Sequence, residues 1–256
     1  MTFDAIIPAG GQIDGEFAAQ VGATNKALIK FGDETILSRT IRALRDTGRV
    51  GRIVLASTDE VRNSPDSQLA DMFVQSGHSG PSSILNGLRE LLAQPSPPQK
   101  VVIVTSDLPF LTAGLITQFI DACPPKVDLC LPLITKGDYQ ARFPHSSSTF
   151  IPLQDNTWTA GNIYLVDVDA LRKSMPHLER IFLVRKSKLG MAKLLGPVFL
   201  FKFMTKQLTV PLVEAKLKQI LKCTGAPVMN CAPELAYDID AMDDYEYAMK
   251  FIGGQL

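Results

Sequence analysis

Short apolar segments of strand length alternate with amphipathic segments of helix length along the first half of the chain. The apolar runs predict strands over residues 3–8, 52–57, 100–105 and 127–133. Apolar positions at helical spacing predict helices over residues 35–47, 82–93 and 112–123, with Ser82 capping the second of them. Such alternation predicts an α/β fold: a three-layer α/β/α arrangement around a mostly parallel, doubly wound sheet.

The pattern is looser in the second half of the chain. It predicts a loop over 146–149, strands over 161–166 and 236–239, and helices over 175–196, 211–223 and 242–252. The sequence contains neither an internal repeat nor a stretch rich enough in flexible residues to separate two domains. We therefore expect residues 1–256 to form a single domain.

Composition and charge exclude several classes of protein. With 46% hydrophobic and 20% charged residues, the chain is too apolar to be disordered as a whole. Its 26 basic residues balance its 26 acidic ones, which argues against a nucleic acid as partner. No apolar run approaches the length of a membrane span, so we expect no membrane partner. The start, residues 1–11, lacks the basic end and the long apolar run of a signal peptide.

Cysteine and histidine usage adds to this picture. The four cysteines form no CxxC pair, and the three histidines lie at no metal-ligand spacing. We expect reduced thiols and a cytoplasmic protein.

Two adjacent glycines, Gly10 and Gly11, follow the first predicted strand. Ligands of open α/β sheets bind at the carboxyl ends of the strands, and glycines there let backbone N–H groups approach a phosphate. The pair matches neither GxGxxG nor GxxxxGK[ST], and glycine pairs also occur in plain tight turns. The loop ends at Lys26, whose ammonium group suits a triphosphate. A solvated surface lysine is the alternative, but the apolar residues 27–29 favour a packed segment.

An aspartate, Asp107, follows the strand predicted over 100–105. This position places its carboxylate at the same edge of the sheet as the glycine loop. A carboxylate there is suited to holding Mg²⁺ against substrate phosphates. The alternative is a capping or Asx-turn role before Pro109.

A second acidic segment lies near the end of the chain. Asp238 and Asp240 flank one residue, so in an extended chain both side chains point to one face, where they can share a cation. For Asp240 a helix N-cap role is the alternative. Asp243 and Asp244 fall in the first turn of the last predicted helix, where the helix dipole favours negative charge, so we expect structural roles for them.

These segments, in this order, resemble the signature motifs of nucleotidyltransferases with a GT-A-like, Rossmann-like fold, and specifically the molybdenum-cofactor nucleotidyltransferase-like branch. The resemblance spans nearly the whole chain and is weakest around residues 175–209. The motifs behind it are Pro8-Ala9-Gly10-Gly11, Asn25-Lys26-Ala27-Leu28, Ser106-Asp107-Leu108-Pro109-Phe110, Gly80-Pro81-Ser82-Ser83 with Asn86-Gly87-Leu88, Thr159-Ala160-Gly161-Asn162, and Asp238-Ile239-Asp240.

The resemblance implies a role for each motif. Residues 1–133 would form the nucleotide-binding half, and residues 134–256 the half that binds the acceptor and completes the metal site. Lys26 and Asp107 would be catalytic, Asp107 and Asp240 would hold Mg²⁺, and Gly161 and Asn162 would bind the acceptor. The nucleotide would be bound by Pro8, Ala9, Gly10, Gly11, Lys26, Ser83 and Gly87.

Two features depart from the family pattern. The family commonly places an arginine in the glycine loop to grip the β- and γ-phosphates, but this chain has no basic residue between Gly10 and Lys26. Asn25 stands where a proline is usual. The candidates for supplying the missing charge are Arg142, Arg185, Lys186 and Lys188.

The resemblance implies transfer of a nucleoside monophosphate from an NTP to a phosphorylated small-molecule acceptor, with release of pyrophosphate. Two alternatives stay open. A GT-A glycosyltransferase would use a nucleotide sugar, but the segment at Asp107 lacks the second aspartate of a DxD motif. A non-catalytic, nucleotide-binding regulatory domain would explain the missing loop arginine. The pattern selects neither the acceptor nor the base.

Overall fold

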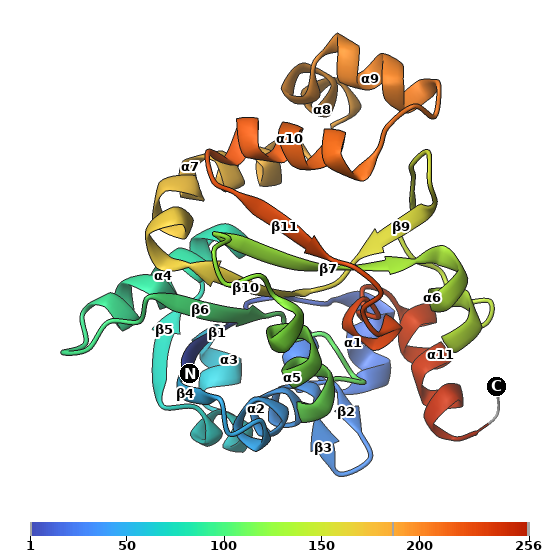
Figure 1. Cartoon of the computed structure of the whole chain (residues 1–256). Coiled ribbons are helices and arrows are strands. Elements are labelled where there is room, and N and C mark those ends of the chain that lie inside the picture. The colour runs from blue at the N-terminus through green and yellow to red at the C-terminus, as the bar shows by residue number, and fades with distance from the viewer. Residues whose placement is uncertain (1, 186, 255–256) are drawn as a thin grey trace.

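A nine-stranded sheet forms the centre of the molecule in a computed structural model, which describes residues 2–185 and 187–254. The strands follow one another in the order β5-β4-β1-β6-β10-β7-β9-β8, with β11 paired to β7 (Figure 1). Four neighbouring strands run parallel: β5 (Met72–Gln75), β4 (Val50–Ser57), β1 (Phe3–Ala9) and β6 (Lys100–Val104).

The second half of the chain extends this sheet with strands of mixed direction. β10 lies antiparallel between β6 and β7, and β11 runs parallel to β7. The remaining pairs, β7–β9 and β8–β9, are antiparallel. These strands are β7 (Leu129–Thr135), β8 (Ile151–Pro152), β9 (Thr157–Ala160), β10 (Ile163–Asp167) and β11 (Gly225–Val228).

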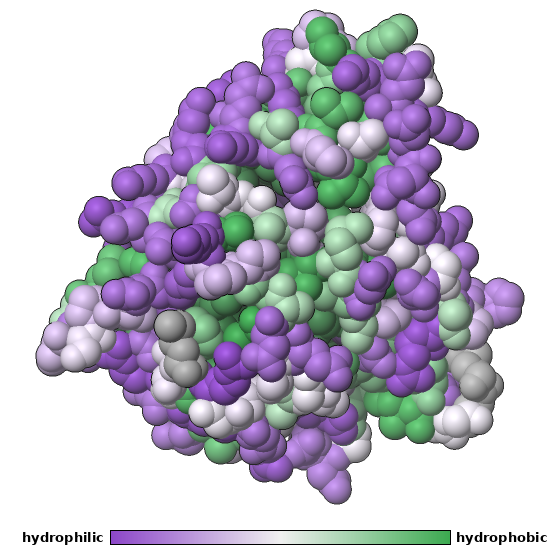
Figure 2. Space-filling model, in the orientation of Figure 1, coloured by the Kyte–Doolittle hydropathy of each residue, from purple (hydrophilic) through white to green (hydrophobic). Residues whose placement is uncertain are grey.

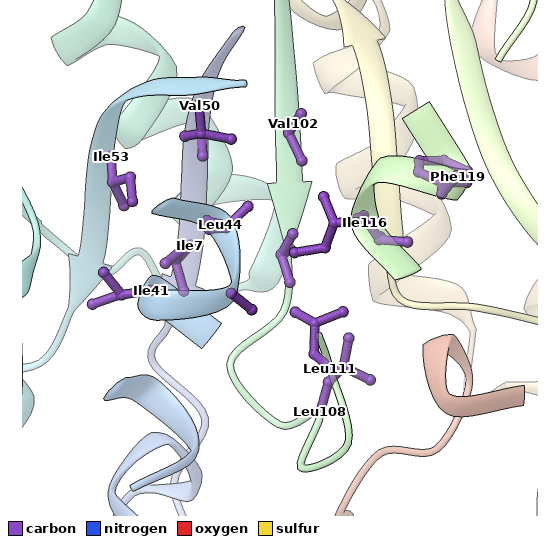
Figure 3. Packing of buried hydrophobic residues seen from close by; sticks show 14 of the residues in the cluster. Ile7, Ile41, Leu44, Val50, Ile53, Val102, Leu108, Leu111, Ile116 and Phe119 are labelled. Carbon is purple, nitrogen blue, oxygen red and sulfur yellow. The ribbon is translucent and has the colours of Figure 1, made fainter. Parts of the chain in front are cut away.

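Helices cover both faces of the sheet. Successive residues of a strand point to opposite sides, so a strand that is apolar throughout needs helices on both faces to bury its side chains. Ile7 of β1 belongs to the core cluster formed with α2 (Ile36–Asp46) and α5 (Ala113–Ala122), part of which Figure 3 shows. Its neighbour Ile6 belongs to the cluster formed with α4 (Gly80–Leu92) and α7 (Val168–Val184). The predicted three-layer α/β/α fold with a mostly parallel core is confirmed.

The other elements surround this framework. A third cluster, rich in aromatic residues, joins α6 to α11. Helices α8 and α9 project from one end of the molecule, beyond α10 (Figure 1). Among the residues that the structure describes, none of the helices combines the length and apolar character needed to cross a bilayer. The remaining bounds are α1 (Gly15–Val21), α3 (Asp59–Arg62), α6 (Lys136–Arg142), α8 (Lys188–Leu195), α9 (Pro197–Met204), α10 (Val210–Leu221), α11 (Met242–Ile252), β2 (Lys30–Phe31), β3 (Glu34–Thr35), and the 3₁₀ turns η1 (Lys26–Leu28), η2 (Pro65–Leu69) and η3 (Pro233–Leu235).

Two predicted helix starts are wrong. Helix α4 begins at Gly80 and its N-cap is Ser79, not Ser82. The two serines form a capping box: Ser79 Oγ accepts from the N–H of Ser82 at 3.0 Å, and Ser82 Oγ accepts from the N–H of Ser79 at 2.9 Å. The helix predicted over 175–196 is two helices, because α7 ends at Val184 and Ser187 caps a separate helix, α8. Helix α7 also starts earlier than predicted, at its N-cap Asp167, whose side chain accepts from the N–H of Ala170 at 3.0 Å.

Two further predictions are corrected. Residues 236–239, predicted as a strand, pair with no strand among the described residues and instead run along the loop that follows β6. Gly161 and Asn162 precede strand β10 instead of beginning it. In addition, the loop between Gly10 and Lys26 contains helix α1, which the sequence pattern did not predict.

Candidate active site

The loops that follow β1 and β6 meet at one edge of the sheet. Ser106 Oγ donates to the carbonyl oxygen of Pro8 at 3.1 Å, which joins the two loops. The N–H of Ile239 donates to the carbonyl oxygen of Asp107 at 3.1 Å. That bond brings the acidic segment before α11 to the same edge, so residues from both ends of the chain come together as the sequence predicts.

Asn25 fixes the position of Lys26. The Asn25 side chain is fully buried; its Nδ2 donates to the carbonyl oxygen of Ala9 at 3.1 Å and its Oδ1 accepts from the N–H of Ala27 at 2.9 Å. The N–H of Lys26 donates to the carbonyl oxygen of Gly11 at 2.9 Å. The asparagine in place of the usual proline therefore ties η1 to the end of β1. Lys26 directs its ammonium group to Asp240, and the two side chains form an ion pair.

Three carboxylates converge beside this ion pair. Asp107, Asp238 and Asp240 each offer one oxygen, and these oxygens lie within 4.8 Å of one another. Asp107 Oδ1 is buried and has no hydrogen-bond partner among the described residues. Burial raises the pKa of Asp107, and burial together with the charges of Asp107 and Asp240 raises the pKa of Asp238 to about 7.

This donor set fits a magnesium ion. Mg²⁺ prefers carboxylate oxygens combined with water and substrate phosphates, and a divalent cation relieves the repulsion among three neighbouring carboxylates. The orphaned Oδ1 of Asp107 supplies a buried acceptor that such an ion would use. Asp238, which the sequence placed beside Asp240 but not among the metal ligands, is part of the cluster. The alternative role of Asp240 as an N-cap is wrong, because Ala241 occupies that position.

A pocket of about 360 Å³ opens on the glycine-loop side of the cluster. Six of the predicted residues line it: Pro8, Gly10, Gly11, Lys26, Ser83 and Asp107. A methyl group at Gly10 would lie 2.9 Å from the Cβ of Ser76, so the close approach of these two loops requires a glycine. Ser83 also organises the loop, since its Oγ accepts from the N–H of Gly77 and donates to the carbonyl oxygen of Ser79, both at 3.0 Å.

Phe182 of helix α7 and Arg185, the residue that caps the end of this helix, line the same pocket. The guanidinium carbon of Arg185 lies 3.3 Å from the centre of the Phe182 ring. Arg185 is thus the candidate for the missing charge that lines this pocket, as far as the described residues show. Arg142 instead pairs with Glu234 at 2.6 Å. Residue 186 and the side chain of Lys188 lie outside the described part of the chain.

A second pocket, of about 460 Å³, adjoins the carboxylates and shares no lining residue with the first. Asp238 and Asp240 line it together with Asn162, one of the two predicted acceptor residues. Serine and threonine hydroxyls from 147–149 add polar groups. The carboxylate cluster thus lies between two pockets, because Asp107 lines the first and the other two aspartates line the second.

Three predicted site residues lie outside both pockets. Ala9 is fully buried, and a methyl group at Gly87 would lie 2.7 Å from Cγ2 of Ile6, so Gly87 packs helix α4 against β1. A methyl group at Gly161 would lie 2.7 Å from the carbonyl oxygen of Leu235, so Gly161 allows two loops to approach each other. The structural role predicted for Asp244 is confirmed: its Oδ2 accepts from the N–H of Asp240 at 3.0 Å and of Ala241 at 2.9 Å.

Sequence reasoning missed Phe182 entirely and did not select Arg185. No signal in the sequence identifies them, because they reach the pocket only through the direction and length of α7. For Asp238 the signal was present in its alternation with Asp240.

Comparisons with known proteins agree with this fold. A solved structure described as a hypothetical transferase from Thermus thermophilus is similar with a TM-score of 0.82 and 26% identity, covering 95% of this chain and 99% of that one. The 2-C-methyl-D-erythritol 4-phosphate cytidylyltransferase from the same organism matches with a TM-score of 0.57 and 17% identity over 98% of each chain. A CMP:2-keto-3-deoxy-manno-octonic acid synthetase complexed with CTP matches with a TM-score of 0.60 and 10% identity over the full length of both.

These last two similarities concern the fold, which is that of nucleotidyltransferases. The search of curated proteins gave no match. The family model of the MobA-like NTP transferase domain matches residues 5–197, which include the glycine loop, Lys26, Asp107 and Asn162. The chain therefore belongs to the family of MobA-like NTP transferase domains, and it is a nucleotidyltransferase.

Proposed function

We propose that the protein transfers a nucleoside monophosphate from an NTP to a phosphorylated small-molecule acceptor and releases pyrophosphate, with Mg²⁺ as cofactor. The observation that supports this proposal is the position of the three carboxylates and Lys26 between two separate pockets. One pocket would take the NTP and the other the acceptor. The family model, which describes NTP transferases, favours an NTP over the nucleotide sugar of a glycosyltransferase.

The reaction is an in-line displacement at the α-phosphorus. An oxygen of the acceptor phosphate forms a bond to that phosphorus while the bond to the pyrophosphate oxygen breaks, and the electron pair leaves with pyrophosphate. Asp107, Asp238 and Asp240 would hold Mg²⁺, which when bound neutralises charge on the substrate phosphates. The chain itself contributes mainly positioning and electrostatic stabilisation.

Lys26 is one of the cationic side chains on the nucleotide side. Its aliphatic stem packs beside Gly11, and its ammonium group is held at the carboxylates by Asp240. On binding of the triphosphate, Lys26 would exchange part of its contact with Asp240 for a phosphate oxygen. The backbone N–H groups of Gly10 and Gly11 would complete the cradle.

Arg185 would supply the charge that the glycine loop lacks. It lines the nucleotide-side pocket, and its guanidinium group stacks on the ring of Phe182, which holds it in place. A guanidinium group there can form bidentate bonds to a phosphate. We assign it to NTP binding.

Both halves of the chain would act within one domain. Residues 1–133 would bind the nucleotide, whereas residues 134–256 would bind the acceptor through Asn162 and complete the metal site through Asp238 and Asp240. Strands from both halves in one continuous sheet support this division of labour.

The test begins with the donor. Calorimetric titration of the full chain with each of the four NTPs and Mg²⁺ should give binding that Lys26→Ala weakens, and absence of Mg²⁺-dependent NTP binding would overturn the proposal. Pyrophosphatase-coupled phosphate release is then measured with the bound NTP and a panel of sugar phosphates and polyol phosphates. Release that depends on one acceptor and is lost in Asp107→Asn is the expected result. A rate in Asp107→Asn equal to that of the wild type would exclude the metal assignment.

A further inference from the structure

Residues 180–213, here called the basic apolar segment, contain seven basic residues and no acidic residue. The 26 acidic residues of the chain therefore all lie outside it, together with the other 19 basic residues. Although the whole chain has no net charge, this segment carries a formal charge of +7 and the remainder of the chain carries −7. The basic residues are Arg180, Arg185, Lys186, Lys188, Lys193, Lys202 and Lys206.

The same segment exposes large apolar side chains. Of the eleven such side chains exposed in the described part of the chain, six lie in the basic apolar segment. Met204 is 81% exposed, Val198 70% and Phe201 63%. Pro197, Phe201 and Met204 follow a spacing of four and three residues, so they share one face of α9. Single exposed apolar residues are ordinary, whereas a group on one projecting element marks a contact surface.

The position of the segment leaves this surface accessible. Figure 1 shows α8 and α9 projecting beyond α10, at the end of the molecule farthest from α2 and α5. In Figure 2, hydrophobic and hydrophilic residues alternate over this end of the molecule. Phe182 and Arg185, which line the nucleotide-side pocket, lie in the first part of the segment. The surface therefore begins at the rim of that pocket.

Charge selects among the occupants of such a surface. A second copy of the chain, seated face to face, would bring two segments of +7 together without an acidic residue in either. A nucleic acid would pair with the lysines but offers no apolar environment to Val198 and Met204. An anionic bilayer offers both, since apolar side chains enter its interfacial region while lysines and arginines remain at the headgroups.

We propose that the basic apolar segment docks the protein on the surface of an anionic lipid bilayer. Leu189, Val198, Phe201 and Met204 enter the interface, and the neighbouring lysines lie at the headgroups. The segment includes Phe182 and Arg185 of the nucleotide-side pocket, but the side chains proposed to contact the bilayer lie outside that pocket, so the inference does not depend on the proposed function. It departs from the sequence-based expectation of no membrane partner, which rested on the absence of a spanning run; lying on a bilayer needs only an amphipathic helix.

The test is flotation of the full chain with lipid vesicles in the absence of nucleotide. Vesicles of phosphatidylcholine containing about 30% phosphatidylglycerol should bind the protein at least ten times more strongly than phosphatidylcholine alone, and high salt should remove the difference. The triple variant Val198→Ser, Phe201→Ser, Met204→Ser should bind at least tenfold more weakly. The triple variant Lys193→Gln, Lys202→Gln, Lys206→Gln should lose the preference for the anionic lipid.

A matched control carries Met249→Ser and Ile252→Ser, which remove two exposed apolar side chains of α11 and should leave vesicle binding unchanged. Thermal unfolding of every variant checks that it is folded. Absence of vesicle binding by the wild type overturns the proposal, as does binding that survives the apolar triple variant. Two results, each in the absence of vesicle binding, would assign the surface to another partner. A dimer in sedimentation that the apolar triple variant dissociates would assign it to a second copy of the chain, and binding of single-stranded RNA would assign it to a nucleic acid.

Discussion

Lys26 and Asp240 form an ion pair although 214 residues separate them in the chain. The pair spans the two halves of the molecule: Lys26 follows the glycine loop, and Asp240 precedes the last helix. Only 15% of the Lys26 side chain is exposed, against 72% of Asp240. The lysine is therefore fixed by its surroundings, whereas the aspartate is the partner that can turn toward a metal ion or a substrate.

Replacing Lys26 by Ala should lower the rate of pyrophosphate release about 10²- to 10³-fold, because one preorganised charge contact to the transition state is lost. The fold should persist, since the ammonium group lies at the surface of a crevice and not in the apolar core. The measurement is the steady-state rate with saturating NTP and acceptor. Lys30→Ala, in the neighbouring hairpin, removes an exposed lysine and should keep the wild-type rate; a large loss there too would point to a structural effect.

Asp238 makes the stability of the metal-free protein depend on pH. Its pKa is about 7 in the folded state and about 3.8 as the ordinary value, so between these values the folded state binds more protons than the unfolded state. The free energy of unfolding therefore falls as pH rises from about 4 to 7. Asp238→Asn removes this penalty and should stabilise the protein by about 1–3 kcal/mol at pH 8, but not at pH 4.

Thermal unfolding with a chelator present, across that pH range, measures this effect. Asp243→Asn is the control, because Asp243 is an exposed carboxylate in the first turn of α11 and outside the cluster. If Asp238→Asn and Asp243→Asn show the same dependence on pH, repulsion within the cluster is not the cause.

Binding of Mg²⁺ should oppose the same repulsion. We expect the ion to raise the unfolding temperature more at pH 8 than at pH 6, since the carboxyl group of Asp238 must lose its proton to become a ligand. Asp107→Asn should weaken Mg²⁺ binding at least tenfold, because it removes the negative charge of the carboxylate that carries the buried, unpaired oxygen. Calorimetric titration in buffers of different ionisation enthalpy detects the released proton. Equal Mg²⁺ affinity in Asp107→Asn would contradict this assignment.

The two glycines of the loop should respond differently to substitution. Gly10→Ala places a methyl group 2.9 Å from the Cβ of Ser76 and should destabilise the protein by about 1–3 kcal/mol. Gly11→Ala meets only the Lys26 side chain, at 3.5 Å, and should cost less than half as much. Denaturant unfolding measures both. The Ser76→Gly change should restore most of the loss in Gly10→Ala, and failure to do so would mean that another contact is responsible.

Arg185→Ala should raise the KM for NTP about tenfold and change kcat less, because a charge-assisted contact to phosphate is lost from the ground state and the transition state alike. Arg142→Ala is the matched control: it removes an arginine that pairs with Glu234 outside the nucleotide-side pocket. Initial rates over a range of NTP concentrations separate the two parameters. An unchanged KM in Arg185→Ala would contradict the assignment of Arg185 to NTP binding. It would mean that Arg185 does not supply the charge that the glycine loop lacks.

Periodicity predicted three of the four strands of the parallel core, because each of these is a short apolar run bounded by turn residues, and it missed β5, which is only partly buried. It placed the N-cap of α4 three residues late, at Ser82 instead of Ser79, since both residues of this capping box are serines and either is a favourable N-cap. It also assigned residues 236–239 to a strand, although they form no ladder among the described residues and the N–H of Ile239 donates to the carbonyl oxygen of Asp107. The carboxylates were predictable because each follows an apolar segment at the ligand-binding edge. Phe182 and Arg185 were not, since their position depends on how α7 crosses the sheet.

The buried amide of Asn25 has a consequence for how the two sides of the crevice move. Because one side chain bonds both to the end of β1 and to the turn that presents Lys26, the lysine and the glycine backbone are coupled as one body. The glycine backbone and Lys26 would thus be preorganised before a triphosphate binds, and little conformational entropy would be lost on that side of the crevice. Adjustment to the incoming ligand would fall instead to the opposite wall, where Asp240 is open to solvent.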